Sequence, residues 1–500
     1  MKANYMQFNS PQFRILSEKQ ISELHFASLH ILEKTGVAIH SEKALELLDG
    51  AGADVSDPKR VKIPSFVVEQ AVRTAPKNIT LYTRDGKPCI FLNGTRTYFG
   101  GVVDNPDILD PYTRKRRPHY IADTVNNIRL IDYLPNITWI MNSGLAHGLP
   151  PELGEKVTQV QCLLNSAKPV VPSTLNAAGL KDLIELVQIV AGGVSNLRAR
   201  PFFINSVEPT TPLVHVREAL EMSLICAEFG IPNVVFNMLM AGATSPATFA
   251  ATLSVANAEL LSHLTVIQLK KPGAPVICGG EPNIMDMRTA IFTYGAPELC
   301  LLSACLTELT HYYGLPMFGT AGATDAKVIG AQAGIEIMHQ VLTSALSGAD
   351  LVHDVGVMDH CTMISPELIV MTDEIIGMVK VTMGGLEIND ETLSLELIDK
   401  IGPGGHFLNE EHTLKYFRKF WVPSIMDRTQ LTAGLTAESV EHCEDLLNKK
   451  TRKILESHTP PPLAEDLVKE IKVLEASWFK AAGLKYQYPV KPLWRCLKPK

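Results

Sequence analysis

The sequence has few cysteines, and no two of them are closer than five residues. Nine cysteines are spread over 500 residues, and no Cys-x-x-Cys spacing occurs. An odd number of widely separated cysteines excludes a complete disulfide framework and a zinc knuckle of the usual spacing. We therefore predict reduced thiols that pack in the core.

Long apolar runs are also missing. The first residues, MKANYMQFNSPQF, contain no apolar stretch of the length that a secretory signal needs. The longest segment without Asp, Glu, Lys or Arg covers 229–258, and Pro232 and Pro246 interrupt it. A membrane-spanning helix disfavours such prolines, so we predict a strand followed by a buried helix. We expect a cytoplasmic chain that makes no membrane contact.

Positive charge is neither abundant nor clustered. The chain has 46 Lys and Arg against 53 Asp and Glu, with a net charge of −7 at pH 7. The one dense basic cluster, RKRRP at 114–118, is typical of a solvated turn. Proteins that bind nucleic acids usually carry a basic face, so we predict no nucleic-acid partner.

The sequence contains a recurring short segment, called a phrase below, in which a proline precedes four or five apolar residues. The phrases begin at Pro135, Pro169, Pro201, Pro232, Pro275 and Pro316, and similar strands without proline begin at Thr97 and Leu351. A strand tolerates proline mainly at its first residue, and segments with helical periodicity separate the phrases. The eight starts are 31 to 43 residues apart, which suits one strand and one helix per unit.

Eight such units predict an α/β fold of the (β/α)8 TIM-barrel type over residues 96–385. An open, doubly wound sheet is the alternative, but the Gly-rich phosphate turn that it would need after an early strand is missing. Residues 1–95 predict a small α+β cap with two amphipathic helices and an Asp-Gly hairpin. Residues 386–500 predict a helical extension and a tail that packs on a neighbour, which makes a homo-oligomer our expectation.

In a TIM barrel the chemistry collects at the carboxyl ends of the strands. The residues at or near these ends are mostly aromatic, acidic or neutral and polar, and almost none is Lys or Arg. This composition disfavours a phosphate or polyanion ligand and favours a cationic or zwitterionic one. We predict that the substrate is bound by Tyr98, Phe99, Asp104, Trp139, Asn142, Asn205, Glu208, Asn237, Glu281, Tyr294, Thr320, His353 and Asp354.

Some of these positions also have a purely structural interpretation. Aromatic residues, Phe236 among them, fill the interior of a barrel as well as they contact a ligand. The glycine pairs Gly100–Gly101 and Gly279–Gly280 either admit a bulky group or make tight turns. His353 and Asp354, with His360 and Cys361, have the residue types of a zinc site but not a known spacing, so we predict no bound metal.

Three motifs resemble those of a known family. YGAPELCLLSACLTELTHYYGLPMFGTAGATDAKVIGAQAGIE begins at Tyr294, LSGADLVHDVG follows at Leu346, and GPGGHFLNEEHTLKYFRKFWVP begins at Gly402. Together they resemble the trimethylamine methyltransferase (MttB-like) family of corrinoid methyltransferases. This resemblance implies a barrel that moves a methyl group from a methylated amine to the cobalt of a cobalamin-type corrinoid, carried by a separate small protein that docks over the barrel.

The resemblance assigns further residues to the corrinoid and to the motifs. The motif residues are Asp325, Lys327, His353, Asp354, Gly405, His406 and His412. We predict corrinoid contacts for Gly100, Gly101, Gly279, Gly280, Asp325, Lys327 and His406.

One departure from the family pattern concerns the substrate. Members specific for trimethylamine carry pyrrolysine in the barrel, whereas this chain contains only standard residues. A quaternary amine needs no such activation because its leaving group is a neutral amine. We therefore predict glycine betaine, or a relative such as proline betaine, carnitine or γ-butyrobetaine, as the methyl donor, and no side chain that acts as a catalyst itself.

In this prediction the acidic residues and aromatic rings face the ammonium group. The substrate carboxylate would receive hydrogen bonds from His353, Asn205, Asn237 and Thr320. Two alternatives stay open: a zinc-dependent corrinoid methyltransferase for methanol or thiols, and a betaine-binding barrel without enzymatic activity.

Overall fold

A computed structural model describes residues 10–101, 104–430 and 440–489. Its centre is a sheet of seven parallel strands in the order β7-β4-β16-β15-β12-β10-β8. The strands are β4 (Tyr98–Gly100), β7 (Ile137–Trp139), β8 (Asn205–Val207), β10 (Asn233–Asn237), β12 (Val276–Gly280), β15 (Met317–Thr320) and β16 (Leu351–His353).

A short extended segment at Val170 closes this sheet into a ring. Val170 forms parallel bridges to Ile140, just after β7, and to Phe203, just before β8. The backbone N–H of Val170 donates to Phe202, and the N–H of Ile204 donates to Val170, at 2.8 and 3.0 Å. The predicted eight-stranded barrel is therefore confirmed, and the alternative of an open sheet is wrong.

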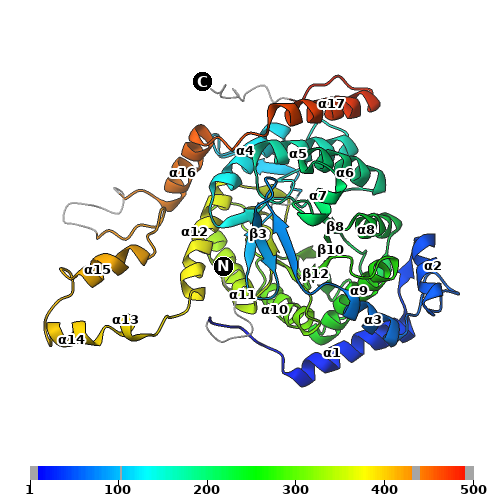
Figure 1. The fold of residues 1–500 in the computed structure, drawn as a ribbon, viewed down its shortest axis with the longest axis horizontal. Coiled ribbons are helices and arrows are strands. Elements are labelled where there is room, and N and C mark those ends of the chain that lie inside the picture. Colours follow the sequence, from blue (N-terminus) through cyan, green and yellow to red (C-terminus); the bar gives the residue numbers. More distant parts are fainter. Residues whose placement is uncertain (1–9, 102–103, 431–439, 490–500) are drawn as a thin grey trace.

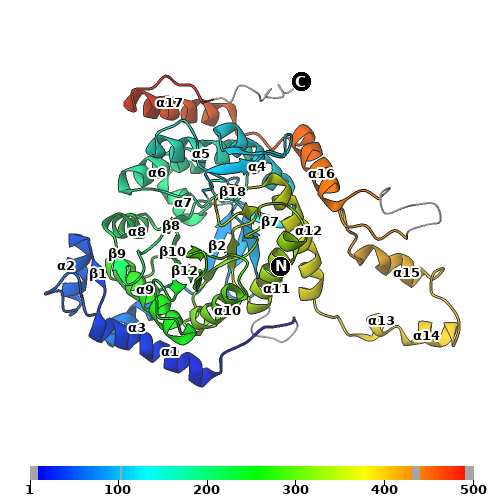
Figure 2. The same cartoon turned by 180° about the vertical axis from the view of Figure 1, so that it is seen from behind.

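Helices surround the barrel and alternate with its strands (Figures 1 and 2). They are α4 (Ile121–Tyr133), α5 (Pro151–Asn165), α6 (Ala177–Ala191), α7 (Val194–Ala199), α8 (Arg217–Phe229), α9 (Phe249–Lys270), α10 (Pro297–Tyr312), α11 (Ala331–Ser347) and α12 (Pro366–Met383). Helix α9 is long and apolar enough to cross a membrane, but 83% of its apolar window is buried inside the protein. It is a core helix, as its place in the charge-free segment predicts.

Alternation along the strands divides the barrel side chains between two cores. Phe99, Val235 and Val352 belong to the cluster between strands and helices. Tyr98, Trp139, Ile204, Phe236, Ile277, Phe318 and Leu351 belong to a second cluster, which fills the barrel interior. Because successive side chains of a strand point to opposite faces, the residues two positions beyond this second set point inward as well.

The N-terminal segment combines helices with short strands. It contains α1 (Glu18–His30), a π-helical turn at Ile31–Thr35, β1 (Ala38–Ile39), α2 (Glu42–Gly50), α3 (Ser65–Thr74) and the hairpin β2 (Ile79–Tyr82) and β3 (Pro88–Leu92). Strand β1 pairs with β9 (Val214–His215). Ile79, Leu81, Ile90 and Leu92 of the hairpin join the interior cluster, so the hairpin closes the amino-terminal end of the barrel.

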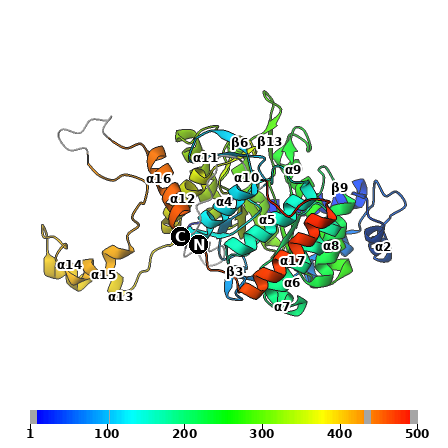
Figure 3. The same ribbon diagram turned by 90° about the horizontal axis from the view of Figure 1, so that it is seen from above.

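Two small sheets cover the opposite end, which we call the mouth (Figure 3). One contains β5 (Asp107–Leu109), β6 (Arg116–Pro118), β17 (Val357–Met358) and β18 (Met363–Ile364). The other contains β11 (Met240–Ala241), β13 (Asn283–Asp286) and β14 (Ile291–Phe292). Each is built from the loops that follow barrel strands.

The C-terminal part contains an extension that leaves the barrel. Residues 386–423, which we call the arm, carry α13 (Asp390–Leu393), α14 (Leu395–Ile401), α15 (Glu411–Tyr416) and a 3-10 turn at Phe417–Lys419. The chain then returns as α16 (Cys443–Ser457) and α17 (Glu465–Ala481), which pack on the helices of the barrel. The last predicted tail residues, 490–500, lie outside the described residues, while Tyr486 and Tyr488 donate to Glu475 of α17 at 2.6 and 2.7 Å.

The interior packing predicts the effect of adding a methyl group at Gly279. A Cβ atom there would lie 1.9 Å from the carbonyl oxygen of Phe318. We expect Gly279→Ala to destabilise the fold by about 1–3 kcal/mol, seen as a lower midpoint of thermal unfolding. Gly334→Ala in α11 is the matched control, because nothing lies within 4 Å of its Cβ position. An unchanged midpoint for Gly279→Ala would show that the space beside this glycine is free.

Candidate active site

The mouth holds a buried histidine between two carboxylates. His353 ends β16, Asp354 follows it directly, and Glu281 follows β12. The Nδ1 atom of His353 lies 2.9 Å from Oδ1 of Asp354, and its Nε2 atom lies 3.1 Å from Oε1 of Glu281. Only 1% of Glu281 and of Asp354 and 4% of His353 is exposed. We call these three residues the triad.

Aromatic rings hold the imidazole in place. The ring of Phe318 stacks on His353 with the centroids 4.6 Å apart and the planes 20° from parallel. Phe236 meets the same imidazole edge-on at 5.0 Å. The two rings come from the inner face of the barrel, Phe318 on β15 and Phe236 on β10, so the imidazole has little freedom to turn away from the carboxylates.

A local backbone conformation places Asp354 beside its own neighbour. In a regular strand, side chains 353 and 354 would point to opposite faces. Asp354 instead has a φ of 82°, in the left-handed region that a residue with a side chain rarely adopts. The hydroxyl of Thr320 donates to Oδ2 of Asp354 at 2.5 Å and so orients the carboxylate. Such a conformation costs free energy and is common at functional sites.

The charges of the triad shift one another's pKa values. Burial alone would lower the pKa of His353, but Asp354 and Glu281 raise it above the ordinary value. Burial raises the pKa of Glu281, and Asp354 raises it further. For Asp354 the effect of burial is outweighed by His353, which holds its pKa below the ordinary value. At neutral pH the triad therefore contains an imidazolium, an ionised Asp354 and a Glu281 that tends to keep its proton.

Two further carboxylates lie nearer to solvent. Asp104 accepts hydrogen bonds from Ser173 and Asn142, while burial raises its pKa. Glu208 is exposed, yet protein surrounds it on most sides, as expected for a side chain at the open end of a barrel. Burial raises the pKa of Glu208, and the charges of Asp104 and Asp354 add to this while His353 opposes it. Glu208 therefore interacts electrostatically with Asp104, Asp354 and His353.

The cluster has an excess of negative charge. Among the described residues, the charged groups that shift the pKa of Asp104, Glu208 and Glu281 include no lysine and no arginine. His353 is the positive group opposite them. The mouth is therefore suited to a cation and unsuited to an anion, as the sequence predicts.

Three predicted substrate residues point away from the mouth. The side-chain amide of Asn237 donates to the carbonyl of Ala256 and to Glu259 in α9, both at 2.9 Å. Asn205 donates to Asn233 at 2.7 Å, and Phe99 packs in the cluster between strands and helices. Their position in the alternation of the strands places them toward the helix layer. The structure corrects the prediction that they contact a ligand.

Tyr98 and Trp139 point into the barrel, but they lie too far from the mouth to contact a ligand there. The hydroxyl of Tyr98 accepts from the N–H of Phe91 in the hairpin, at the closed end of the barrel. Trp139 is completely buried, and its indole N–H donates to the carbonyl of Tyr98 at 3.2 Å. For both residues the alternative of core packing, and not ligand contact, describes the structure.

The glycine pairs make room for the chain's own atoms. A Cβ on Gly100 or Gly101 would lie 2.7 Å or less from the indole of Trp139. A Cβ on Gly280 would lie 2.1 Å from Oδ1 of Asn237, and Gly279 is crowded by Phe318 as described above. The space beside these glycines is filled, so the structure does not support the predicted corrinoid contacts there.

Tyr294 and Thr320 do join the triad. Tyr294 is buried, and burial together with the charges of Glu281, Cys361 and Asp354 raises its pKa. Asp325 supports it from the rim by accepting from the N–H groups of Tyr294 and Gly295 at 2.8 and 2.9 Å.

The remaining motif residues lie farther out. Lys327 is exposed at the rim, and its Nζ atom donates to the carbonyl of Asp325. His412, on the arm, lies 2.9 Å from the hydroxyl of Ser394, and His406 is exposed on the same arm. The structure therefore does not bring His406 to the mouth with the other predicted residues.

Sequence reasoning missed the role of Phe318, which forms the closest ring contact of His353. The signal was available, because Phe318 lies two positions before Thr320 and so shares its face of the strand. The side chain of Glu155 was missed as well, and burial raises its pKa to about 7.

Among the described residues, the triad is also the group that could hold a metal ion. Its possible ligand atoms all lie within 4.8 Å of one another. His360 and Cys361, considered together with His353 and Asp354 in the sequence, are not part of this group. In the structure as described, the two nitrogens of His353 face the two carboxyl groups, and the three residues form an ion-paired cluster.

Comparisons with known proteins agree with this picture. The sequence profile of the trimethylamine methyltransferase (MTTB) family matches residues 1–475. The chain is 32% identical over 457 residues to the trimethylamine methyltransferase MttB of Desulfitobacterium hafniense (strain DSM 10664 / DCB-2), covering 91% of this chain and 92% of that protein. It is 29% identical to the glycine betaine methyltransferase of D. hafniense (strain Y51), covering 95% and 98%.

A solved structure is similar at a lower level. The monomethylamine methyltransferase MtmB of Methanosarcina barkeri has a TM-score of 0.47 and 11% identity, with coverage of 95% of this chain and 90% of that one. The barrel and the family match together define a TIM-barrel methyltransferase. The chain belongs to the trimethylamine methyltransferase family.

The triad predicts a histidine that stays protonated in mildly alkaline solution. We expect the pKa of His353, followed by NMR of labelled histidine, to lie above that of an exposed histidine. Glu281→Gln removes one of the two carboxyl groups that raise this pKa and should lower it. Glu208→Gln should change it less, since Glu208 is absent from the groups that dominate it. A His353 that titrates as an exposed histidine does would contradict the ion pair.

Proposed function

We propose that this protein transfers a methyl group from a quaternary amine to the Co(I) of a corrinoid carried by a separate small protein. One observation carries the proposal: a buried, net acidic barrel mouth in which the described residues include no lysine or arginine near the carboxylates. Family membership supports methyl transfer as the reaction. We also propose a cytoplasmic location, in keeping with the burial of the apolar helix α9.

The chemistry of a quaternary amine suits a site without an electrophile. The N–CH3 bond breaks with its electron pair going to nitrogen, and the carbon–cobalt bond forms from the electron pair of Co(I). The amine leaves as a neutral molecule, so no proton has to be supplied. The protein's contribution is to hold the cation, exclude water and align one methyl group with the acceptor.

The residues of the mouth support these tasks. Asp104 and Glu208 are open to solvent and can attract the cation, and the rings of Phe236 and Tyr294 offer apolar contact deeper in the barrel. The space beside the glycine pairs is filled by the chain's own atoms, in keeping with an acceptor presented by another protein. The rim, with exposed Lys327, is then the part of the chain nearest to that partner.

Two rival functions are separable by experiment. A zinc-dependent methyltransferase for methanol or thiols requires stoichiometric zinc, which elemental analysis of the purified protein measures. A betaine-binding barrel without activity requires binding without methylation of the corrinoid. Membership of a methyltransferase family speaks against the second rival.

The proposed reaction predicts a specific loss on neutralising the outer carboxylates. With reduced corrinoid protein as acceptor, the conversion of Co(I) to methyl-cobalt is followed by absorbance. We expect Asp104→Asn and Glu208→Gln to lower kcat/KM for a quaternary amine about tenfold each, or ~1.4 kcal/mol. Glu470→Gln, on the exposed face of α17, is the control. Unchanged kcat/KM for both mouth variants would remove these carboxylates from the site.

We further propose that the arm assembles this chain with a second copy of itself. Helices α13, α14 and α15 contain no buried residue, while large apolar side chains along the arm are exposed. These include Leu386, Ile388, Leu395, Ile398, Leu408, Leu414, Phe420 and Val422. Apolar surface gathered in one segment of a soluble protein is typical of an interaction site.

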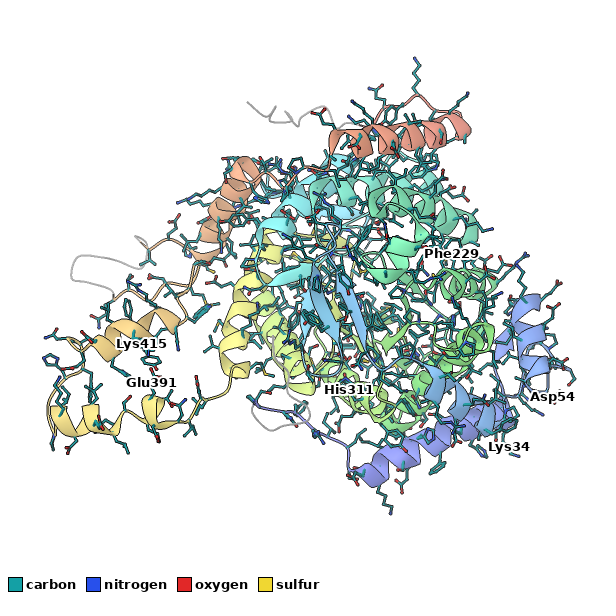
Figure 4. The ribbon with its side chains drawn as sticks, in the orientation of Figure 1. Lys34, Asp54, Phe229, His311, Glu391 and Lys415 are labelled. Atoms are coloured by element: carbon teal, nitrogen blue, oxygen red, sulfur yellow. The ribbon has the colours of Figure 1, made fainter. Side chains whose placement is uncertain are left out.

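The arm is an ordered projection with a fixed base. Ser424 and Ile425 donate backbone N–H groups to Glu374 of α12, the helix from which the arm departs. Lys415 of α15 and Glu391 of α13 form an ion pair across the arm, and their side chains point toward one another (Figure 4).

The position of the arm favours a second copy over the corrinoid protein. The arm projects at the level of the hairpin and away from the mouth (Figure 3), whereas the corrinoid protein must dock at the mouth. An apolar surface of this size also needs permanent cover, which a partner that leaves after each turnover does not give.

Charges placed on α14 should therefore break the assembly. Leu395 and Ile398 are 67% and 52% exposed, so Leu395→Glu with Ile398→Glu should leave the fold intact and reduce the molar mass measured by light scattering. Val473→Glu on α17, at a residue 72% exposed, is the matched control. A wild-type protein with the mass of one chain would contradict this proposal.

A further inference from the structure

The side chains that the sequence predicts as donors for a substrate carboxylate lie against carboxylates or point away from the mouth. Thr320 donates to Asp354, and both nitrogens of His353 face carboxylates. Ser173 and Asn142 donate to Asp104, and the hydroxyl of Tyr294 is engaged with the thiol of Cys361. The sequence predicts four donors for a substrate carboxylate, all of them described residues. Thr320 and His353 face carboxylates, and Asn205 and Asn237 point outward.

Acceptors, in contrast, are in surplus. Oε1 of Glu281 and Oδ1 of Asp354 are buried and face the two nitrogens of His353 at 3.1 and 2.9 Å. Asp104 and Glu208 add two more carboxylates, against the one imidazolium. A ligand that enters this site meets oxygen atoms and negative charge on several sides.

The cations nearest to the rim are paired with acidic groups. Arg116 contacts Asp107 and Asp359, each at 2.6 Å. Lys327 lies 3.6 Å from Asp359 and donates to the carbonyl of Asp325. A carboxylate on the substrate would have to separate one of these pairs or remain unpaired beside other carboxylates.

We infer that the methyl donor is a quaternary ammonium ion with a net positive charge and no carboxylate, of the tetramethylammonium or choline type, and that betaines are poor substrates. This inference rests on the proposed function. A simple cation balances part of the excess negative charge and requires no donor. A betaine brings no net charge, and its carboxylate would lie among Asp104, Glu208 and Asp354, where like charges repel.

Binding and turnover test the inference separately. Calorimetry with the protein alone compares tetramethylammonium, choline and glycine betaine as ligands, and the cobalt absorbance assay compares the same three as methyl donors. We expect at least one of the two cations to exceed glycine betaine about 100-fold in both affinity and kcat/KM. Glycine betaine at or above the cations in affinity would overturn the inference and leave the proposed function standing.

A charge-reversal variant makes the comparison sharper. Glu208→Lys should weaken the cations and improve glycine betaine, so that their ratio falls about tenfold or more, while Glu470→Lys on α17 should leave the ratio unchanged. A ratio that Glu208→Lys does not alter would overturn the inference. Cation binding in the expected order without methylation of the corrinoid by any of the three would support the ligand class and reject the proposed reaction.

Discussion

The ion pair of His353 with Asp354, extended to Glu281, is the constraint on which the rest of the site depends. A protonated imidazole in a buried site requires a counter-charge, which Asp354 supplies at 2.9 Å, while Glu281 lies 3.1 Å from the other ring nitrogen. In doing so the triad uses up both donors of its only cationic side chain. The atoms that remain to face the substrate are oxygens, and the site keeps an excess of negative charge. This excess selects a positively charged ligand.

The strand order was predictable because proline has a positional meaning in sheets. Six proline-led phrases and two similar runs gave the eight strands, and the family motifs gave His353 and Asp354. The face that each side chain points to was not assigned from the sequence, although alternation would have separated Phe99, Asn205 and Asn237 from Thr320 and His353. The contact between Gly100 and Trp139 could not be predicted, since it depends on how two neighbouring strands are aligned.

The same limit explains why the predicted carboxylate donors failed. Each is a polar residue at a strand end. This criterion predicts a position in the barrel, but it does not predict whether the hydrogen-bond donor is free. Whether Asn237 is free depends on Glu259 of α9, a residue 22 positions further along the chain. Availability is a property of the folded neighbourhood, and only the structure shows that these donors are taken.

Family membership fixes the reaction more firmly than the substrate. The relatives compared above are named for trimethylamine and for glycine betaine, at 32% and 29% identity to this chain. Few side chains line the mouth, so two proteins can share the barrel and differ in the ligand by a handful of residues.

The location of the arm suits this division. Because it projects from the closed end of the barrel, contacts between copies can persist while the mouth stays open to a substrate and to a docking partner. Assembly and methyl transfer then depend on separate surfaces, and each can change without loss of the other.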